Sequence, residues 1–144
     1  MTHVDMHFYF HGLVILAIGL LGGVPFATAI RTGNGREVAW RVVHAGASSG
    51  GALVIAMGSM IGHLGMSGRW NAIALVVQLV ASYGLVGGMV LAAATGERGI
   101  GKRAAGPPTA MWWSVKVLYQ SGVVSQLASV GILLVASLRR LIGA

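Results

Sequence analysis

Long runs without charge alternate along the chain with short segments that are rich in arginine and glycine. Four runs carry almost no Lys, Arg, Asp or Glu: residues 6–30, 42–68, 70–96 and 104–138. A helix needs about 20 apolar residues to cross a hydrocarbon core of about 30 Å, so each run is long enough to span a bilayer. The pattern predicts transmembrane helices at about 7–30, 39–64, 70–95 and 110–138.

The composition agrees with this pattern, since 56% of the residues are hydrophobic and only 9% are charged. The connections between the runs are too short to form a soluble domain. We therefore predict an all-α integral membrane protein with a single transmembrane domain over residues 1–144, folded as a bundle of four transmembrane helices. The bacterial inner (cell) membrane is the expected location.

The first apolar run could also be compared with a secretory signal, because Ala27-Thr28-Ala29 has the form of a cleavage site. However, Asp5 precedes the run and no Lys or Arg does, so the basic region of a signal is missing. The pattern favours a retained membrane helix.

The formal net charge of +7 would suggest nucleic-acid binding in a water-soluble protein. Here the cations lie in the connections and at the helix ends, which is typical of anchors for membrane lipid headgroups, so we expect membrane lipid and no nucleic acid as partner. They are Arg31, Arg36, Arg41, Arg69, Arg98, Lys102, Arg103, Arg139 and Arg140. Lys116 is the one cation inside a run, and we expect it to extend toward the nearby membrane surface.

Glycines recur at four-residue spacing inside the predicted helices. The pairs are Gly46 with Gly50, Gly58 with Gly62, and Gly84 with Gly88. Such small pairs let helix backbones approach closely, either within one four-helix bundle or between copies of the chain. The sequence leaves both possibilities open.

The available side-chain chemistry is narrow. The chain has no cysteine, and its three acids, Asp5, Glu37 and Glu97, lie at or outside the ends of the predicted helices. A proton-coupled transporter would need a carboxylate within the membrane, so the pattern argues against one. A demanding reaction would have to use a metal or a cofactor.

His44 is the strongest candidate ligand, because it lies just inside the helix predicted at 39–64. An imidazole there can face a helix interface and bind a buried metal or haem. Ser48 and Gly51 follow at four and seven residues, so a planar ligand would meet a hydroxyl and a small residue on the same helical face. A histidine that only hydrogen-bonds to a neighbouring helix is the alternative.

The other histidines are weaker candidates. His3, His7 and His11 recur at four-residue spacing and could form a three-histidine metal site, although the first two are expected at the headgroup level. His11 lies deeper and is followed by Gly12, which leaves room for another group. His63 is expected at the membrane interface.

Three segments resemble the membrane-bound styrene oxide isomerases. They are Trp40 to Gly46, with Trp, His and Gly at 40, 44 and 46; His11-Gly12; and Arg98-Gly99-Ile100. The distance from His44 to Arg98 also matches the family's spacing, and the four-helix layout covers nearly the whole chain.

The resemblance implies a homotrimer that holds haem b between its subunits, with His44 as the iron ligand and Trp40, Gly46, His11 and Arg98 around the cofactor. It implies an isomerase of small hydrophobic epoxides. In that family ferric iron acts as a Lewis acid, the benzylic C–O bond opens, and a hydride shift gives the aldehyde without net redox change. An apolar pocket that excludes water would suit this chemistry.

The chain departs from the family's pattern at two positions. Gly50 stands six residues after the ligand histidine, where the family has Asn, and Met89 stands nine residues before the arginine, where the family has Tyr. Ser48, Ser49 or Tyr83 could supply the missing polar group, and we take Ser48 and Tyr83 as candidate catalytic residues. A haem protein for electron transfer, sensing or haem handling, and a structural subunit without cofactor, remain alternatives.

Overall fold

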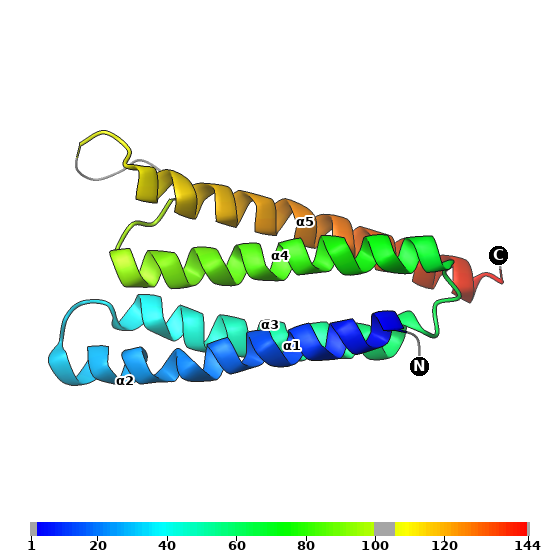
Figure 1. The fold of residues 1–144 in the computed structure, drawn as a ribbon, viewed down its shortest axis with the longest axis horizontal. Helices are drawn as coiled ribbons and strands as arrows, with labels where there is room; N and C mark the ends of the chain where they lie inside the picture. The colour runs from blue at the N-terminus through cyan, green and yellow to red at the C-terminus, as the bar shows by residue number, and fades with distance from the viewer. Residues whose placement is uncertain (1–2, 100–105, 144) are drawn as a thin grey trace.

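The computed structural model describes residues 3–99 and 106–143, and the regular structure in this part of the chain is helical. The helices are α1 His3–Leu21, α2 Gly23–Thr32, α3 Glu37–Ile61, α4 Gly68–Thr95 and α5 Ala110–Leu141. Figure 1 shows them lying along one long axis, with both chain ends at the same end of the molecule. The first two helices run on as one segment, so four helices are long and apolar enough to cross a membrane. This confirms the all-helical, four-span prediction.

The division between α1 and α2 has a simple chemical cause at Pro25. Proline has no backbone N–H, so the carbonyl of Leu21 loses its partner in the helical ladder. Gly22 between the two helices keeps a right-handed helical conformation, and its N–H donates to the Ile18 carbonyl over 2.9 Å. The helix is therefore interrupted at Gly22, while the span continues to Thr32.

The helices pack as two antiparallel hairpins (Figure 1). The first hairpin consists of α1, α2 and α3, and the second consists of α4 and α5. Contacts within each hairpin are far more extensive than those between them, and α4 provides the main contact with the first hairpin. The four spans thus form two hairpins in loose contact.

Glycine makes the close contact within the first hairpin. A Cβ atom added to Gly19 would lie 2.3 Å from the Ser48 backbone nitrogen, and one added to Gly51 would lie 2.5 Å from the Leu16 nitrogen. Both distances are shorter than real side chains allow, so α1 and α3 touch backbone to backbone.

The second hairpin also contains a glycine contact, between Gly84 and Gly122, where added Cβ atoms would meet backbone atoms at 2.9 and 2.7 Å. Gly88 packs on the ring of Tyr119. Of the two possibilities left open by the sequence, packing within one chain holds for Gly84 and Gly88, whereas an added Cβ at Gly50 would meet nothing within 4 Å. A contact between copies at Gly50 stays a prediction.

A buried polar cluster adds specificity to the second hairpin. Gln78 of α4 donates to the Ser82 hydroxyl over 3.0 Å and to the Gln126 side-chain oxygen Oε1 over 3.3 Å, and it accepts from the Ser129 hydroxyl of α5 over 2.6 Å. In a hydrocarbon solvent these groups find their partners only in the protein, so the cluster fixes how α5 is rotated against α4.

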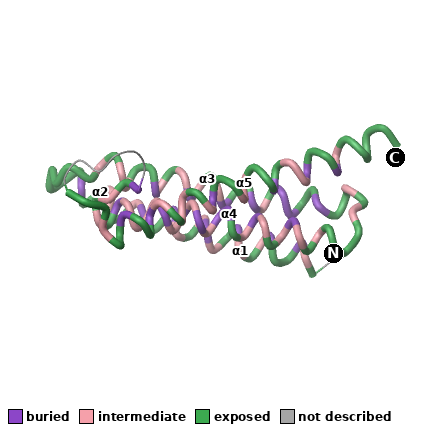
Figure 2. Tube along the Cα trace, turned by 90° about the horizontal axis from the view of Figure 1, so that it is seen from above, coloured by how far each residue is buried: buried purple, intermediate pink, exposed green. Residues whose placement is uncertain are grey.

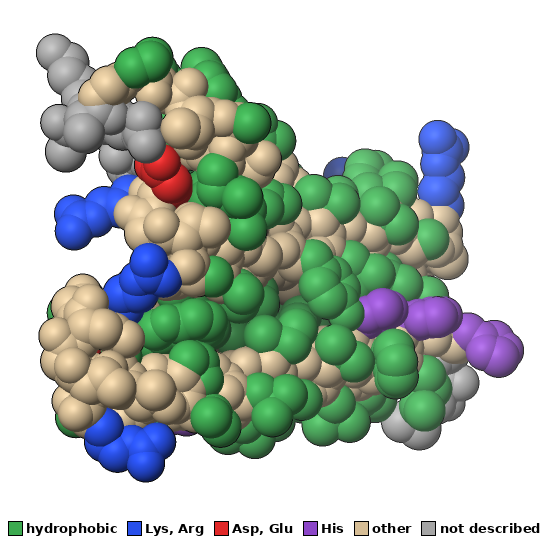
Figure 3. Space-filling model, turned by 60° about the vertical axis from the view of Figure 1, so that its left-hand side comes forward, with side chains coloured by type: hydrophobic (Ala, Val, Ile, Leu, Met, Phe, Trp, Pro, Cys, Tyr) green, Lys and Arg blue, Asp and Glu red, His purple; other side chains and the backbone are tan. Residues whose placement is uncertain are grey.

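The outer surface is strongly apolar. Buried residues form a narrow strip where helices meet, and most of each span faces outward (Figure 2). Leu13, Val76 and Leu127 are between 57% and 71% exposed. Charged side chains gather at the ends, with hydrophobic side chains between them (Figure 3). Such a surface is suited to lipid, and the protein is a membrane protein by length and composition of its helices.

Three helix ends differ from the predicted bounds by three or four residues, and α1 begins at His3 and not at residue 7. α3 ends at Ile61 and not at residue 64, so His63 lies in the turn that follows, where Gly65 adopts a positive φ of 66°. α5 continues to Leu141 and includes both terminal arginines, Arg139 and Arg140. Ile100, Lys102 and Arg103 lie outside the described residues.

Candidate functional site

His44 is held in one chemical form by the backbone of α1. Its Nδ1 lies 2.9 Å from the Gly19 carbonyl oxygen. A carbonyl can only accept, so Nδ1 carries the proton and donates it. In the neutral imidazole the lone pair is then on Nε2, which is the arrangement that metal-binding histidines adopt.

The His44 imidazole is closely packed by α2. The ring of Phe26 in α2 stacks on the imidazole, with ring centroids 6.3 Å apart and an interplanar angle of 24°. A Cβ at Gly23 would lie only 3.3 Å from Nδ1, so glycine lets α2 pass directly over the ring. Trp40, one turn before His44, is half-buried. These contacts fix the orientation of the imidazole.

Ser48 and Gly51 lie on the same side of α3 as His44, as their spacing predicts, but α1 covers this side. Gly51 packs against the backbone of Leu16, and the Ser48 side chain lies against Gly19. The Ser48 Oγ is buried and has no hydrogen-bond partner in the described part of the chain. A planar ligand on His44 therefore cannot also lie over Ser48 and Gly51 without displacing α1.

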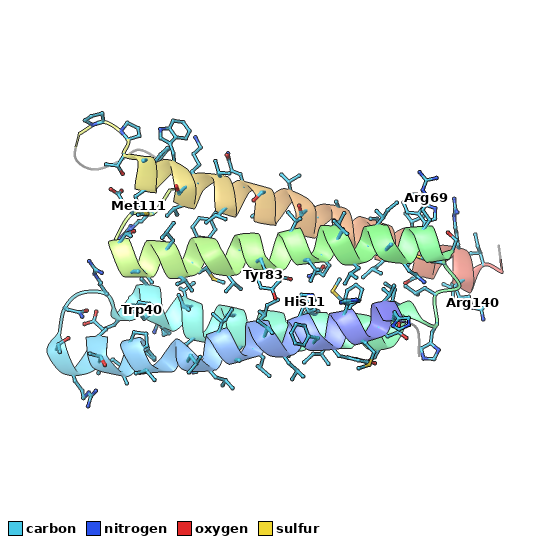
Figure 4. All side chains as sticks on the ribbon, in the orientation of Figure 1. His11, Trp40, Arg69, Tyr83, Met111 and Arg140 are labelled. Carbon is cyan, nitrogen blue, oxygen red and sulfur yellow. The ribbon has the colours of Figure 1, made fainter. Side chains whose placement is uncertain are left out.

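His11 and Tyr83 form the most direct polar contact between the two hairpins. The Tyr83 hydroxyl lies 2.8 Å from His11 Nδ1, with the rings edge to face. Figure 4 shows the two side chains pointing toward one another between α1 and α4. His7 stacks on His11 at 6.0 Å, whereas His3 is exposed. Among residues 3–99 and 106–143, no group of three His, Cys, Asp or Glu could hold a metal ion, so the three-histidine site is not assembled there.

A cleft of about 490 Å³ opens between the hairpins at the end opposite the chain termini. Its walls come from α3, α4 and α5, and they include Arg36, Ala39, Val42, Met89, Arg98 and Tyr119. The structure thus brings together Met89 and Arg98, which the family spacing singles out. It adds Tyr119 and Arg36, which the sequence reasoning did not place in the site.

Tyr119 could have been found only with knowledge of helix pairing. Its ring packs on Gly88, where an added Cβ would lie 3.2 Å from the ring. The sequence shows Gly84 and Gly88 at four-residue spacing, which marks a face of α4 for close approach. It does not show that α5 covers that face with Tyr119.

The mouth of the cleft is positively charged. The Arg36 guanidinium donates to the Ala94 carbonyl, which ties the start of α3 to the end of α4. Arg98 is exposed beside it. Glu97 is turned to the start of α5, where it accepts from the Thr109 hydroxyl over 3.2 Å. The arginines therefore face the cleft while this carboxylate is bound elsewhere.

His44 and the cleft lie on different sides of α3. Val42 lines the cleft and precedes His44 by two residues, which is about 200° around a helix axis. Gly46, two residues after His44, contacts Met89, since an added Cβ would lie 3.1 Å from its sulfur. Within one chain, therefore, His44 faces α1 and α2 while Arg98, Met89 and Tyr119 face the other side.

These features define a class: a four-span membrane protein with an oriented imidazole inside one hairpin and an amphipathic cleft between the two. The family model described as styrene oxide isomerase matches residues 4–138. This match includes all four spans, and the chain belongs to the styrene oxide isomerase family, which is a family of isomerases. None of the curated proteins compared with the chain matches it.

Proposed function

We propose that this protein is a membrane-embedded, haem b-dependent isomerase that converts a hydrophobic epoxide to a carbonyl compound. Family membership supports the isomerase activity. The hydrogen bond from His44 Nδ1 to the Gly19 carbonyl carries the cofactor proposal, because it leaves the Nε2 lone pair for iron.

The residues present fit haem b in three respects. His44 offers a neutral imidazole nitrogen, and Phe26 stacks on that imidazole and fixes its plane. Arg36 and Arg98 offer two cations, which match the two carboxylates of haem b. When bound, ferric haem b supplies a Lewis acid, so the chain needs no buried carboxylate base.

The opposite placement of His44 and the cleft favours a site shared between copies. A single chain presents its imidazole on one side of α3 and its arginines on the other. If the His44 side of one copy meets the cleft of the next, the contact is head to tail, and it gives a ring when the rotation between copies closes. A homotrimer, as the family resemblance implies, is the ring that we propose.

Within the cleft, the side chains have separable tasks. Ala39 and Val42 give an apolar wall that keeps water from a cationic centre formed when an epoxide opens. We assign to Tyr119 the orienting hydroxyl that Met89 cannot supply, because both side chains line the same cleft. Ser48 and Tyr83 lie at helix contacts outside the cleft lining, so their catalytic roles stay predictions.

The first test is the absorption spectrum of the detergent-purified protein. We expect a Soret band in the parent, loss or a shift of that band in His44→Ala, and retention in His63→Ala, whose imidazole lies exposed in the turn after α3. Aldehyde formation from styrene oxide, followed without added redox cofactor, should be lost in His44→Ala. A protein that stays colourless after haem supplementation would overturn the cofactor proposal and favour a structural subunit.

A subunit-mixing experiment tests the shared site. His44→Ala chains and chains with both Arg98→Gln and Tyr119→Phe are each expected to be inactive. Co-expressed, they should regain part of the turnover, because some contacts then join an intact His44 to an intact cleft. Activity no higher than the sum of the separate variants would place the whole site in one chain.

The positions of Gly50 and Met89 favour a second candidate, a haem protein without isomerase activity. Gly50 leaves open space and Met89 packs on Gly46, so neither gives a hydroxyl or amide to a substrate. A Soret band that depends on His44, a reversible redox couple and the absence of turnover over a panel of epoxides would support this candidate over the first.

A further inference from the structure

A second hollow lies at the end of the molecule that carries the chain termini. It measures about 540 Å³ and is formed by the connection between α3 and α4 together with the last turns of α5. Leu64, Met66, Ile132 and Val135 give it apolar walls. None of these residues takes part in the His44 contacts or in the cleft described above.

The rim of this groove is basic. Arg139, Arg140 and Trp70 line it, and no acidic residue is among its lining residues. Arg69 and Arg140 lie at the same end of the molecule in Figure 4. Asp5 is also at this end, but it is only 8% exposed and lies beside Gly62 of the first hairpin. The positive charge of Arg139 and Arg140 therefore favours binding of an anion.

The groove lies at the height of a bilayer surface. In α5, Lys116 and Arg139 are separated by 23 residues, which corresponds to about 34 Å along a helix. This distance is close to the thickness of the hydrocarbon core. Lys116 lies over the rings of Trp112 and Trp113 at the other end, so both ends of α5 carry interfacial side chains.

Gly131 gives the groove its depth. It lies in α5 and is a lining residue, and a Cβ atom added there would meet nothing within 4 Å. The glycine is therefore not required for helix contact within the chain, unlike Gly84 or Gly122. A larger side chain at this position would extend into the groove without moving the neighbouring helices.

We propose that this groove binds one acidic phospholipid, with an acyl chain along its apolar walls and the headgroup phosphate between Arg139 and Arg140. Charge complementarity favours a lipid anion over a second copy of the chain, whose net charge is +7. A phosphate accepts hydrogen bonds from the arginine guanidinium groups, while Trp70 lies at the level of the headgroups. The site is independent of haem and of isomerase activity.

The test is native mass spectrometry of the intact detergent-purified protein with added phosphatidylglycerol or phosphatidylcholine. We expect phosphatidylglycerol to bind at least tenfold more tightly. Replacing both Arg139 and Arg140 by Gln should weaken phosphatidylglycerol binding about tenfold or more, since each cation near a membrane surface contributes substantially. Gly131→Leu should weaken it as well, although it removes no charge.

The matched control replaces Arg31 and Arg41 by Gln, since both are exposed and lie on the first hairpin. This control should change phosphatidylglycerol binding less than twofold. An equal loss in the control would show general charge attraction and overturn the site. Binding unaffected by Gly131→Leu would also overturn it, and so would a lower oligomer mass in Gly131→Leu, which would mean that another copy fills the groove. Circular dichroism of each variant checks that its helices are intact.

Discussion

The two hairpins are built from spans of similar length and apolarity, yet their interfaces differ. In the first, the glycines of α1 and α3 bring backbones together. In the second, a glycine contact is combined with the buried cluster around Gln78. All five histidines of the sequence lie before residue 64, in the first hairpin and the turn after it. Hydropathy thus specifies that four segments span the membrane, while contact chemistry gives the hairpins different tasks.

The comparison also explains where the cleft can form. Each hairpin is closely packed internally, and the contact between them is less extensive. Among the described residues, His11 bonds to Tyr83 in the middle, and Arg36 donates to the Ala94 carbonyl at one end, so both contacts join the hairpins. Space for a ligand therefore lies between two closely packed units, with Ala39 and Val42 of the first hairpin on one side and Met89 and Tyr119 of the second on the other.

The largest effect is expected from closing the glycine contact of the first hairpin. Gly19→Val would place carbon atoms against the Ser48 backbone and force α1 away from α3. We expect a loss of about 3 kcal/mol or more in the free energy of unfolding, which is at the upper end of overpacking effects. Detergent-induced unfolding followed by circular dichroism measures it.

Gly50→Ala is the matched control, because its Cβ would meet nothing within 4 Å. Alanine in a helix interior is favoured over glycine by about 0.5–1 kcal/mol, so this variant should be as stable as the parent or slightly more so. Equal losses of unfolding free energy in both variants would contradict the difference between Gly19, which contacts a neighbouring backbone, and Gly50, which does not.

A smaller loss is expected in the second hairpin from Gln78→Leu. The change keeps the side-chain volume and removes the acceptor for Ser129 and the donor to Ser82 and Gln126. Polar contacts between membrane helices are worth about 0.6 kcal/mol on average and up to about 1.7, so we expect about 1 kcal/mol in the same unfolding assay. Gln120→Leu, on the exposed side of α5, should have no measurable effect. A loss as large as that of Gly19→Val would remove the contrast between the hairpins.

The sequence predicted the four spans because the positions of charges along a membrane helix are strongly constrained. It placed the end of the second span too late, at 64, since hydropathy continues past Ile61 while the chain turns with Gly65 at a positive φ of 66°. The division of the first span at Gly22 was not predicted. The division arises because Pro25 has no backbone N–H to donate to the Leu21 carbonyl. A count of apolar residues does not consider backbone hydrogen bonds.

The candidate site could be predicted only in part. Helical spacing correctly placed His44 and Ser48 on one face, but spacing does not tell which neighbour covers that face, and here it is α1. The acceptor of the His44 proton is Gly19, 25 residues away. Tyr119 joins Met89 only through the rotation of α5 against α4, which the buried polar cluster sets. Both contacts depend on how two helices pack against each other, which the pattern within one helix does not show.

The contact between the hairpins should show a weaker coupling than either interface. Tyr83→Phe, His11→Ala and the double variant form a cycle that isolates the hydrogen bond of 2.8 Å. We expect a coupling free energy of about 0.6 kcal/mol, the average for such bonds in membrane proteins. The same detergent-unfolding assay measures it. Additive effects of the two single variants would show that this hydrogen bond does not couple the hairpins.

The smallest effect concerns Lys116 at the cleft end of α5. Its Nζ lies 5.0 and 4.8 Å from the ring centroids of Trp112 and Trp113, so the ammonium is attracted to both rings. Partly exposed contacts of this kind are worth about 0.5–1 kcal/mol. Lys116→Gln should therefore cost about 0.5 kcal/mol and alter tryptophan fluorescence, whereas Lys116→Arg should keep both properties of the parent. An equal loss in the arginine variant, which keeps the positive charge, would contradict an attraction between the cation and the two rings.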